Sequence, residues 1–256
     1  MAVKNFGVDP SRWNVINNYD TFLSSTYNGM KIKYAFLRLG FMSNGVGQVD
    51  SLFQKHYNNL VGKIPLGVYI YSYATSVSEA KKEAQWVLSQ IKNLKIEFPI
   101  VFDYEDQSLL NLNLSRRQYT DICKAFLDEV KANNYYAMMY CNPNMIENYL
   151  IKDEILKYPL WLAHYTSEGK QKQYGQLIWQ FGTFTPKGAV GEVDANFAYE
   201  QVGKYIRDNN LNKPVVKPVD YDVKITATKT VKKSKLTAET KMLQDNGYFV
   251  HCDKVE

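Results

Sequence analysis

The sequence is poor in residues that form disulfides or bind transition metals. It has three cysteines and three histidines among 256 residues. Cys123, Cys141 and Cys252 lack the spacing of a disulfide framework or a zinc site, so we expect neither. Cys123 falls in a helical pattern and Cys141 in a strand-like one, where each is expected to be a small buried hydrophobic side chain. We therefore predict no metal and no cofactor.

The sequence also lacks a signal peptide and any long apolar run. Its first nine residues pass directly into a strand-like pattern, and no later segment reaches transmembrane length. The net charge of +5 is mild, and no Lys/Arg cluster is interleaved with aromatic residues, so no nucleic-acid partner is expected. We expect synthesis in a host cytoplasm, no membrane insertion, and action outside the cell only after release by another agent.

Aromatic residues, by contrast, are abundant. They make up 14% of the chain, with 20 Tyr against 12 Phe. Tyr has a flat apolar face and a hydroxyl group, which suits contact with sugar rings. The hydrophobic fraction of 45% and charged fraction of 22% are ordinary for a globular protein. The length suits one large α/β domain, or one domain with a small appendage.

Strand-like and helix-like segments alternate along most of the chain. Eight strands are predicted, of which the first five are followed by helices and the last three mostly are not. This alternation predicts a parallel sheet closed into a TIM-like barrel, with site residues at the C-terminal strand ends. The predicted strands are Asn5–Asp9, Lys33–Gly40, Ile64–Ala74, Phe98–Asp106, Tyr135–Cys141, Tyr158–Tyr165, Leu177–Phe181 and Val190–Phe197. The predicted helices are Asn14–Ser25, Asp50–Val61, 76–94, Ser115–Ala132, Pro143–Leu150 and Tyr199–Asp208, and Phe41–Gly47 is predicted as a loop.

The stretch Phe98–Asp106 starts as an apolar run and ends in three carboxylates. A buried ionised carboxylate is costly unless it is paired or solvated, so Asp103 and Glu105 are expected where the strand emerges into a wet cavity. Residues two apart share a strand face and lie roughly 6–7 Å apart at Cα, and glycosidases use carboxyls about 5–9 Å apart. The pair therefore predicts glycosidase chemistry; the structural alternative is a strand that runs into an acidic surface turn.

Other strand ends add acids and aromatic side chains to the same expected mouth. Strand one ends in Asp9 and strand eight in Asp194, which gives four acids in all. Acids for chemistry and flat rings for sugar faces predict a carbohydrate-binding cleft. The candidate substrate-binding residues at the remaining strand ends are Tyr69, Tyr71, Tyr73, Tyr140, Trp161, Tyr165, Trp179 and Gln180.

Six short blocks stand in order along residues 1–208. They are Gly7–Trp13, Gly67–Ala74, Val101–Glu105, Leu160–Tyr165, Ile178–Phe181 and Val193–Phe197. Together these blocks resemble glycoside hydrolase family 25, the Chalaropsis-type lysozymes, which include many phage and bacterial endolysins. The resemblance implies a flattened barrel with five β/α units followed by three further strands. It also implies cleavage of the β-1,4 bond between N-acetylmuramic acid and N-acetylglucosamine in peptidoglycan.

The resemblance assigns roles to individual residues. Glu105 matches the general acid and Asp103 the second catalytic acid, while Asp9 and Asp194 match flanking acidic positions. Aromatic positions near the sugar are matched by Tyr69, Tyr71, Trp161 and Tyr165. The sequence departs from the family at Arg38–Gly40, where many members carry a more polar strand end. His164 lies at a variable position and receives no role.

The expected mechanism places a proton on Glu105. Crowding by the other three acids and partial burial would raise its pKa. Asp103 would stay ionised, and would either attack the anomeric carbon or orient the N-acetyl group of the substrate as the nucleophile. Both routes need an anion at the same place, so the sequence leaves both open. Asp9 and Asp194 would hold hydrogen bonds that set the protonation states.

Three other readings of these residues stay open. Four carboxylates could bind a divalent cation, although no histidine joins them by spacing. A non-catalytic sugar-binding barrel would make the acids dispensable. A chitinase-like glycosidase would need a longer Asp-x-x-Asp-x-Asp-x-Glu strand, but Pro99, Phe102 and their neighbours occupy those positions. A phage or prophage endolysin acting on peptidoglycan is the preferred interpretation.

The composition changes after about residue 210. We predict a catalytic barrel over residues 1–210, a proline-punctuated linker over 211–219 and a small strand–helix–strand module over 220–256. Residues 213–256 hold nine Lys and six Asp or Glu, so this stretch contributes +3 of the net +5. Such a short module cannot bury a sufficient core alone. It is expected to bind the cell wall, to self-associate, or to be an incomplete part of a longer module; a basic solvated appendage is the alternative.

Overall fold

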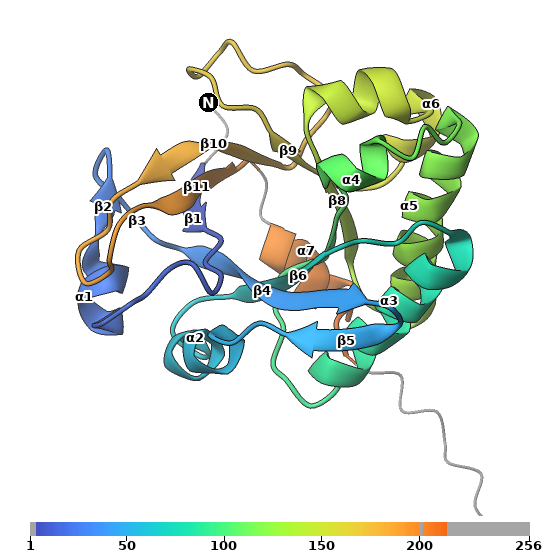
Figure 1. Cartoon of the computed structure of the whole chain (residues 1–256). Helices are drawn as coiled ribbons and strands as arrows, with labels where there is room; N and C mark the ends of the chain where they lie inside the picture. The colour runs from blue at the N-terminus through green and yellow to red at the C-terminus, as the bar shows by residue number, and fades with distance from the viewer. Residues whose placement is uncertain (1–3, 200–201, 214–256) are drawn as a thin grey trace, which may run out of the picture. The chain divides into compact units, whose positions relative to one another are not determined.

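A closed barrel of eight strands forms the centre of the fold (Figure 1). The computed structural model describes residues 4–199 and 202–213. Around the barrel the strand order is β1-β11-β10-β9-β8-β7-β6-β4, and pairing of β1 with β4 closes the ring. The strands are β1 (Asn5–Val8), β4 (Tyr34–Ser43), β6 (Leu66–Tyr71), β7 (Ile100–Asp103), β8 (Ala137–Cys141), β9 (Leu160–Ala163), β10 (Ile178–Phe184) and β11 (Val193–Ala198). The α/β barrel expected from the sequence is confirmed.

One strand runs against the predicted direction. The sheet was expected to be parallel throughout, but β11 is antiparallel to both β1 and β10. A parallel pair needs a crossover of a dozen or more residues, whereas β10 and β11 are joined only by residues 185–192. Asp194 therefore lies near the start of its strand, not at its end. The pairing of Val8 with Ala195 still brings Asp194 to the same rim as Asp9.

Helices cover the outside of the barrel, and α3 and α5 lie side by side along one flank (Figure 1). The described helices are α1 (Tyr19–Ser24), α2 (Phe53–Leu60), α3 (Val77–Ile91), α4 (Gln107–Leu110), α5 (Arg116–Ala132), the π-helical turn η1 (Met145–Tyr149), α6 (Lys152–Ile155) and α7 (Val202–Asp208). Residues 160–198, all of them described, hold β9, β10 and β11 without a helix between them. Within the described part of the chain, no helix combines the length and apolar character needed to cross a membrane.

Side-chain alternation divides the apolar residues into an inner and an outer core. On β7, Val101 belongs to the cluster inside the barrel, whereas Ile100 and Phe102 belong to the cluster under the helices. Phe102 stacks on Phe126 of α5, with ring centroids 4.4 Å apart. Because successive strand residues face opposite sides, Asp103 faces inward with Val101. The same alternation acts on every barrel strand.

The inner core fills the barrel at the end where the parallel strands begin. Tyr34 stacks on Phe98 at 4.8 Å, and Phe36 stacks on Trp161 at 4.5 Å. Helix α7 follows β11 and adds Val202 and Ile206 to this cluster. Packed rings leave no room for substrate at this end. The inward-facing acids lie at the other end, where the parallel strands finish.

The segment predicted as the loop Phe41–Gly47 is a β-hairpin instead. Strand β4 continues to Ser43 and pairs antiparallel with β5 (Val46–Val49). The turn residues Asn44 and Gly45 have φ values of 52° and 76°, as a two-residue hairpin turn requires. A Cβ on Gly47 would lie 2.0 Å from Trp86 Nε1 on α3. Glycine at this position therefore lets the hairpin dock closely on the helix.

Two predicted helices differ from the expectation, one in length and one in type. The segment Asn14–Ser25 becomes helical only at Tyr19, because the Asn18 side chain accepts from Thr21 N and caps the helix there. Residues 26–27 and 30–31 form a small two-stranded ribbon, β2 (Thr26–Tyr27) with β3 (Met30–Lys31). The predicted helix Pro143–Leu150 is present over residues 143–149, but residues 145–149 of it form the π-helical turn η1.

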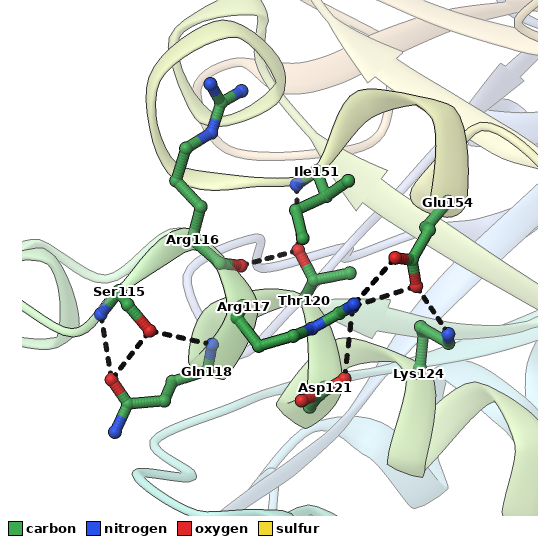
Figure 2. Close-up of polar contacts among 9 residues, drawn as sticks. All are labelled: Ser115, Arg116, Arg117, Gln118, Thr120, Asp121, Lys124, Ile151 and Glu154. Carbon is green, nitrogen blue, oxygen red and sulfur yellow. Dashed lines mark hydrogen bonds and ion pairs between the residues drawn. The ribbon is translucent and has the colours of Figure 1, made fainter.

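The loop that follows β8 is anchored to the start of α5 (Figure 2). Ser115 and Gln118 form a capping box that begins α5. Thr120 Oγ1 accepts from Ile151 N at 2.8 Å. Glu154 of α6 accepts from Arg117 at 2.7 and 2.8 Å and from Lys124 at 2.6 Å. These bonds hold η1 and α6 against α5, which limits movement of the loop between β8 and η1.

The predicted C-terminal parts lie outside the described residues. The chain divides into the units Met1–Val215 and Val216–Glu256, and every described residue belongs to the first. The predicted linker at 211–219 is described only at 211–213, and the predicted module at 220–256 not at all. Wall binding or self-association through this module stays a prediction.

Candidate active site

The structure brings the four predicted acids together at the mouth of the barrel. Asp9 directly follows β1, Asp103 ends β7, Glu105 lies two residues further on, and Asp194 is the second residue of β11. Burial and the charges of Asp194 and Glu105 raise the pKa of Asp9. Burial and the charges of Glu105 and Asp9 likewise raise the pKa of Asp103. Such mutual effects require the carboxyls to share one poorly solvated site.

Asp9 is held by two amide side chains. Asn196 Nδ2 donates to Asp9 Oδ2 at 2.5 Å, and Gln180 Nε2 lies 3.2 Å from both oxygens. The amides are themselves oriented, since Tyr140 OH donates to Gln180 Oε1 at 2.9 Å and Trp161 Nε1 donates to Asn196 Oδ1 at 2.8 Å. Burial raises the pKa of Asp9 well above its ordinary value, while both amide bonds oppose this by favouring the ionised form.

Asp103 has a buried oxygen with no partner. No hydrogen bond reaches Asp103 Oδ1 from the described residues. Burial raises the pKa of this carboxyl well above its ordinary value, Glu105 and Asp9 add to the effect, and Arg38 opposes it. Arg38 is itself paired with Asp50 at 2.7 Å. The surroundings thus shift Asp103 toward its protonated form, which opposes the ionised state expected from the sequence, and a substrate donor to Oδ1 would shift it back.

Glu105 is the carboxyl that lines the cavity. The cavity has a volume of about 490 Å³. Asn142 Nδ2 donates to Glu105 Oε2 at 3.3 Å. Burial raises the pKa of Glu105, the hydrogen bond from Asn142 opposes this, and the charge of Asp194 raises it further. The residues around the cavity are Glu105, Tyr140, Asn142, Pro143, Asn144, Ala163, His164, Tyr165 and Gln180.

The neighbouring acid Asp106 does not join this group. Its side chain accepts from Ser108 N at 2.8 Å and so caps α4. It also accepts from Tyr71 OH at 2.9 Å. The helix cap ends the strand pattern after Asp103, so the predicted strand Phe98–Asp106 is shorter in the structure. Glu105 is left as the acid that faces the cavity.

The predicted aromatic residues are arranged at different depths. Tyr140 and Tyr165 line the cavity with Gln180, and Tyr165 OH donates to Asp194 Oδ1 at 3.1 Å. Tyr69 packs edge-on against Trp161 inside the barrel. Tyr71 and Tyr73 lie at the end of β6, with their ring centroids 5.3 Å apart.

The two predicted tryptophans do not reach the cavity. Trp161 is 1% exposed and lies beneath Tyr140, with ring centroids 4.8 Å apart. Trp179 faces outward from β10 because it is adjacent to the inward-facing Gln180. Its Nε1 donates to His164 O at 2.8 Å. Direct sugar contact was therefore the wrong prediction for Trp179, which holds the loop after β9, and Trp161 supports the site from below.

Several site residues were missed by sequence reasoning. Asn142 follows Tyr140 by two residues and Asn196 follows Asp194 by two, so strand periodicity places each on the face of its neighbour. Arg38 was named only as a departure from the family pattern. Trp13 lies in a block that carried the resemblance, is 72% exposed, and has the Arg12 guanidinium 4.7 Å from its ring. An exposed Trp on the loop after Asp9 suits contact with a sugar face.

Metal binding finds no support in the described residues. Among residues 4–199 and 202–213, no three His, Cys, Asp or Glu side chains are placed to hold one metal ion. Cys123 and Cys141 are both buried and free.

Another buried acid, Glu83, holds the turn that carries Tyr73. Glu83 of α3 is 3% exposed. It accepts from Ser72 Oγ at 2.6 Å and from Tyr73 N at 3.2 Å. Burial raises its pKa from an ordinary 4.5 to about 7, although both hydrogen bonds oppose the shift.

Glu83→Gln is expected to flatten the pH dependence of stability. The folded-state pKa lies above the unfolded one, so the stability linked to Glu83 is present below pH 4.5 and is lost as pH rises through about 7. The loss amounts to about 3 kcal/mol at most. Urea unfolding of the wild type and of Glu83→Gln from pH 4 to pH 8 measures this loss. Glu97→Gln is the control, because Glu97 lies at the opposite end of β6, where its N–H donates to Leu66 O. Parallel pH curves for wild type and Glu83→Gln would contradict the assignment.

A barrel that gathers buried carboxyls beside tyrosine rings at one mouth defines a glycoside hydrolase site. Comparison with known families gives the same class: the model for glycosyl hydrolases family 25 matches residues 8–193. The chain belongs to this family.

Individual relatives are distant. The uncharacterized protein YegX of Escherichia coli K12 is 24% identical over 197 residues, which are 74% of this chain and 68% of YegX. The modular autolysin LytC from Streptococcus pneumoniae, solved with a synthetic peptidoglycan ligand, has a TM-score of 0.66 at 23% identity over 76% of this chain. The match spans only 46% of LytC.

Two further solved structures share the fold. The CTP1L endolysin has a TM-score of 0.65 at 24% identity, over 80% of this chain and 70% of the endolysin. A bacterial lysozyme from Streptomyces coelicolor has a TM-score of 0.65 at 20% identity, over 80% of this chain and 97% of the lysozyme. At these identities the likeness establishes the barrel fold.

Proposed function

We propose that this chain is a lysozyme that cleaves the β-1,4 bond between N-acetylmuramic acid and N-acetylglucosamine in peptidoglycan. The observation that carries the proposal is the pair formed by Glu105, a cavity-lining acid of raised pKa, and Asp103, with its unpartnered oxygen. The similar solved structures include an autolysin, an endolysin and a lysozyme, one of them with a peptidoglycan ligand. These likenesses support peptidoglycan as the substrate.

Glu105 is the general acid in this mechanism. Its raised pKa favours the protonated form that a general acid needs, and Asn142 donates a hydrogen bond to the carboxyl. The proton passes to the glycosidic oxygen as the bond to the anomeric carbon breaks. The leaving sugar departs with a free hydroxyl group.

Asp103 stabilises the positive charge that develops at the anomeric carbon. An N-acetyl N–H of the substrate is a donor of the kind that Asp103 Oδ1 lacks. A bond from that donor would lower the pKa of Asp103 and favour its ionised form. Ionised Asp103 then either attacks the anomeric carbon or positions the N-acetyl oxygen to attack it. Asp9 is held at the same mouth by hydrogen bonds from Asn196 and Gln180.

An endolysin of phage or prophage origin is the biological role that we propose. The likeness to the CTP1L endolysin supports it. In this role the protein is made in the host cytoplasm and reaches the wall after release.

The bond specificity is tested by the new reducing ends. Purified cell walls are digested, reduced with borohydride and hydrolysed, and the sugar alcohols are identified by mass. A muramidase leaves muramitol, whereas a glucosaminidase leaves glucosaminitol. Chitin is the matched substrate without lactyl groups. Glucosaminitol, or turnover of chitin at the rate of peptidoglycan, would contradict the proposal.

A further inference from the structure

Arg38 is a mostly buried cation that points into the barrel from β4. Its neighbours Leu37 and Leu39 pack in the outer core, whereas Phe36 belongs to the inner cluster. Because successive strand residues face opposite sides, Arg38 shares the inward face of Phe36. Its side chain is 12% exposed. A charge this far removed from water is costly unless other groups compensate for it or make use of it.

Backbone pairing places Arg38 at the mouth that holds the acids. Strand β4 pairs with β1 on one side and with β6 on the other. Arg38 N donates to Pro10 O at 3.2 Å, one residue after Asp9. On the other side, Arg38 is the register partner of Tyr69. Burial and Asp9 raise the pKa of Tyr69 and the charge of Arg38 lowers it, so the guanidinium lies close enough to act on this hydroxyl.

Asp50 fixes the guanidinium from one side. Arg38 Nε donates to Asp50 Oδ2 at 2.7 Å. Asp50 follows β5, its side chain is 1% exposed, and it also accepts from Arg12 N and Leu52 N, both at 3.0 Å. Two backbone amides thus share in stabilising the charge of Asp50. Within the described part of the chain, Nη1 and Nη2 of Arg38 donate no hydrogen bond, so this side of the guanidinium remains available to the mouth.

The charge of Arg38 acts on Asp103. Burial, Glu105 and Asp9 raise the pKa of Asp103, and Arg38 lowers it. Asp50 is not among the main influences on this carboxyl. Coulomb energy falls with distance, so the ion pair presents its positive side to Asp103. The titratable groups around Asp103 are Glu105, Asp106, Asp9, Arg38, Tyr69, Tyr71, Tyr73, Tyr140 and Cys141, and Arg38 is the cation of this set.

Arg38 treats the two acids of the catalytic pair differently. The main influences on the pKa of Glu105 are burial, Asn142 and nearby acids, and Arg38 is not one of them. The guanidinium therefore favours the ionised form of Asp103 without doing the same for Glu105. Glycosidases need this separation, because one carboxyl must donate a proton while the other is an anion.

We propose that Arg38 is a positioning residue that acts through Asp103, and that its charge keeps this carboxyl ionised for glycan cleavage. The inference rests on the proposed function, because it concerns the state of Asp103 in the same reaction. Both catalytic routes need Asp103 as an anion, yet one of its oxygens is buried without a partner. A fixed cation offsets part of the cost of that anion before substrate binds.

The test is the pH profile of kcat/KM on soluble peptidoglycan fragments. Its acid and basic limbs report the ionisation of the free enzyme's essential groups. Loss of the Arg38 charge should move the acid limb up by about one pH unit, which lowers kcat/KM on that limb about 10-fold. The basic limb, which reports Glu105, should stay in place. The profile is thus expected to narrow from one side.

The variants are chosen to separate charge from packing. Arg38→Met is made together with Asp50→Asn, because the single change would leave a buried carboxylate unpaired. Arg38→Gln can still donate to Asp50 and makes the same prediction, so it serves if the paired variant does not fold. Arg38→Lys keeps the charge and should keep both limbs. Arg207→Met is the matched control, because Arg207 is exposed on α7, which packs at the other end of the barrel.

An unmoved acid limb in a folded, active variant that lacks the Arg38 charge would overturn the inference while leaving glycan cleavage intact. An equal shift in Arg207→Met would overturn it as well. So would a shift that persists in the residual activity of the Asp103→Asn background, where the carboxyl on which Arg38 acts is absent. If the wild type released no new reducing ends at any pH, the proposed function itself would be overturned.

Discussion

Glu105→Gln is expected to lower kcat on bare cell walls about 100-fold or more. Glutamine is nearly isosteric and can still accept from Asn142, but it cannot donate an acidic proton. KM should change little, because the cavity keeps its shape. The release of reducing ends from purified walls measures the effect. Activity like that of the wild type would remove Glu105 from the mechanism.

The control for this variant is Glu97→Gln. Glu97 N donates to Leu66 O where β6 begins, at the end of the barrel opposite the mouth. The same chemical change there should leave kcat unaltered. Circular dichroism of both variants checks that any loss at Glu105 comes from chemistry and not from unfolding.

Asp103→Asn is expected to change activity and stability in opposite directions. Activity should fall about 100-fold or more, because the transition state loses its anion. Stability should rise at neutral pH. Burial raises the pKa of Asp103 above its ordinary 3.8, so the stability linked to this carboxyl is lost as pH rises from 3.8 through the folded-state pKa. Asparagine does not titrate, and the difference in favour of the variant should grow with pH.

Thermal unfolding from pH 4 to pH 8 measures the second effect. A variant less stable than the wild type at pH 8 would show that the buried charge is fully compensated in the native site. Asp103→Ala with added azide then separates the two catalytic routes. If Asp103 attacks the sugar directly, azide takes its place and gives a glycosyl azide; if the N-acetyl group attacks, azide does not occupy that place.

The barrel and its four acids were predictable from local patterns. Each strand carries a two-residue period, so Val101 and Asp103, or Tyr140 and Asn142, fall on one face without knowledge of the fold. Strand direction is not encoded in that period. The prediction that Asp194 ends a parallel strand failed for this reason, and only the short connection over residues 185–192 indicates the reversal.

Two other predictions failed although the sequence itself contained the information needed to correct them. The Asn44-Gly45 dipeptide is a strong hairpin indicator, yet the segment was predicted as a loop. Trp179 alternates with Gln180, so the two cannot both face the cavity. The ionisation of Asp103 was beyond sequence reasoning, because it depends on burial and on the pairing of Arg38 with Asp50.

The reversed last strand also sets when this enzyme becomes competent during its synthesis. Asp9 precedes its partner Asn196 by 187 residues, and Asn196 and the acid Asp194 emerge only with β11. Strand β1 pairs with both β4 and β11, so the ring stays open until β11 has left the ribosome. A chain that ends before β11 lacks Asp194 and the Asn196 side chain that holds Asp9, so an incomplete polypeptide is expected to have no complete acid cluster.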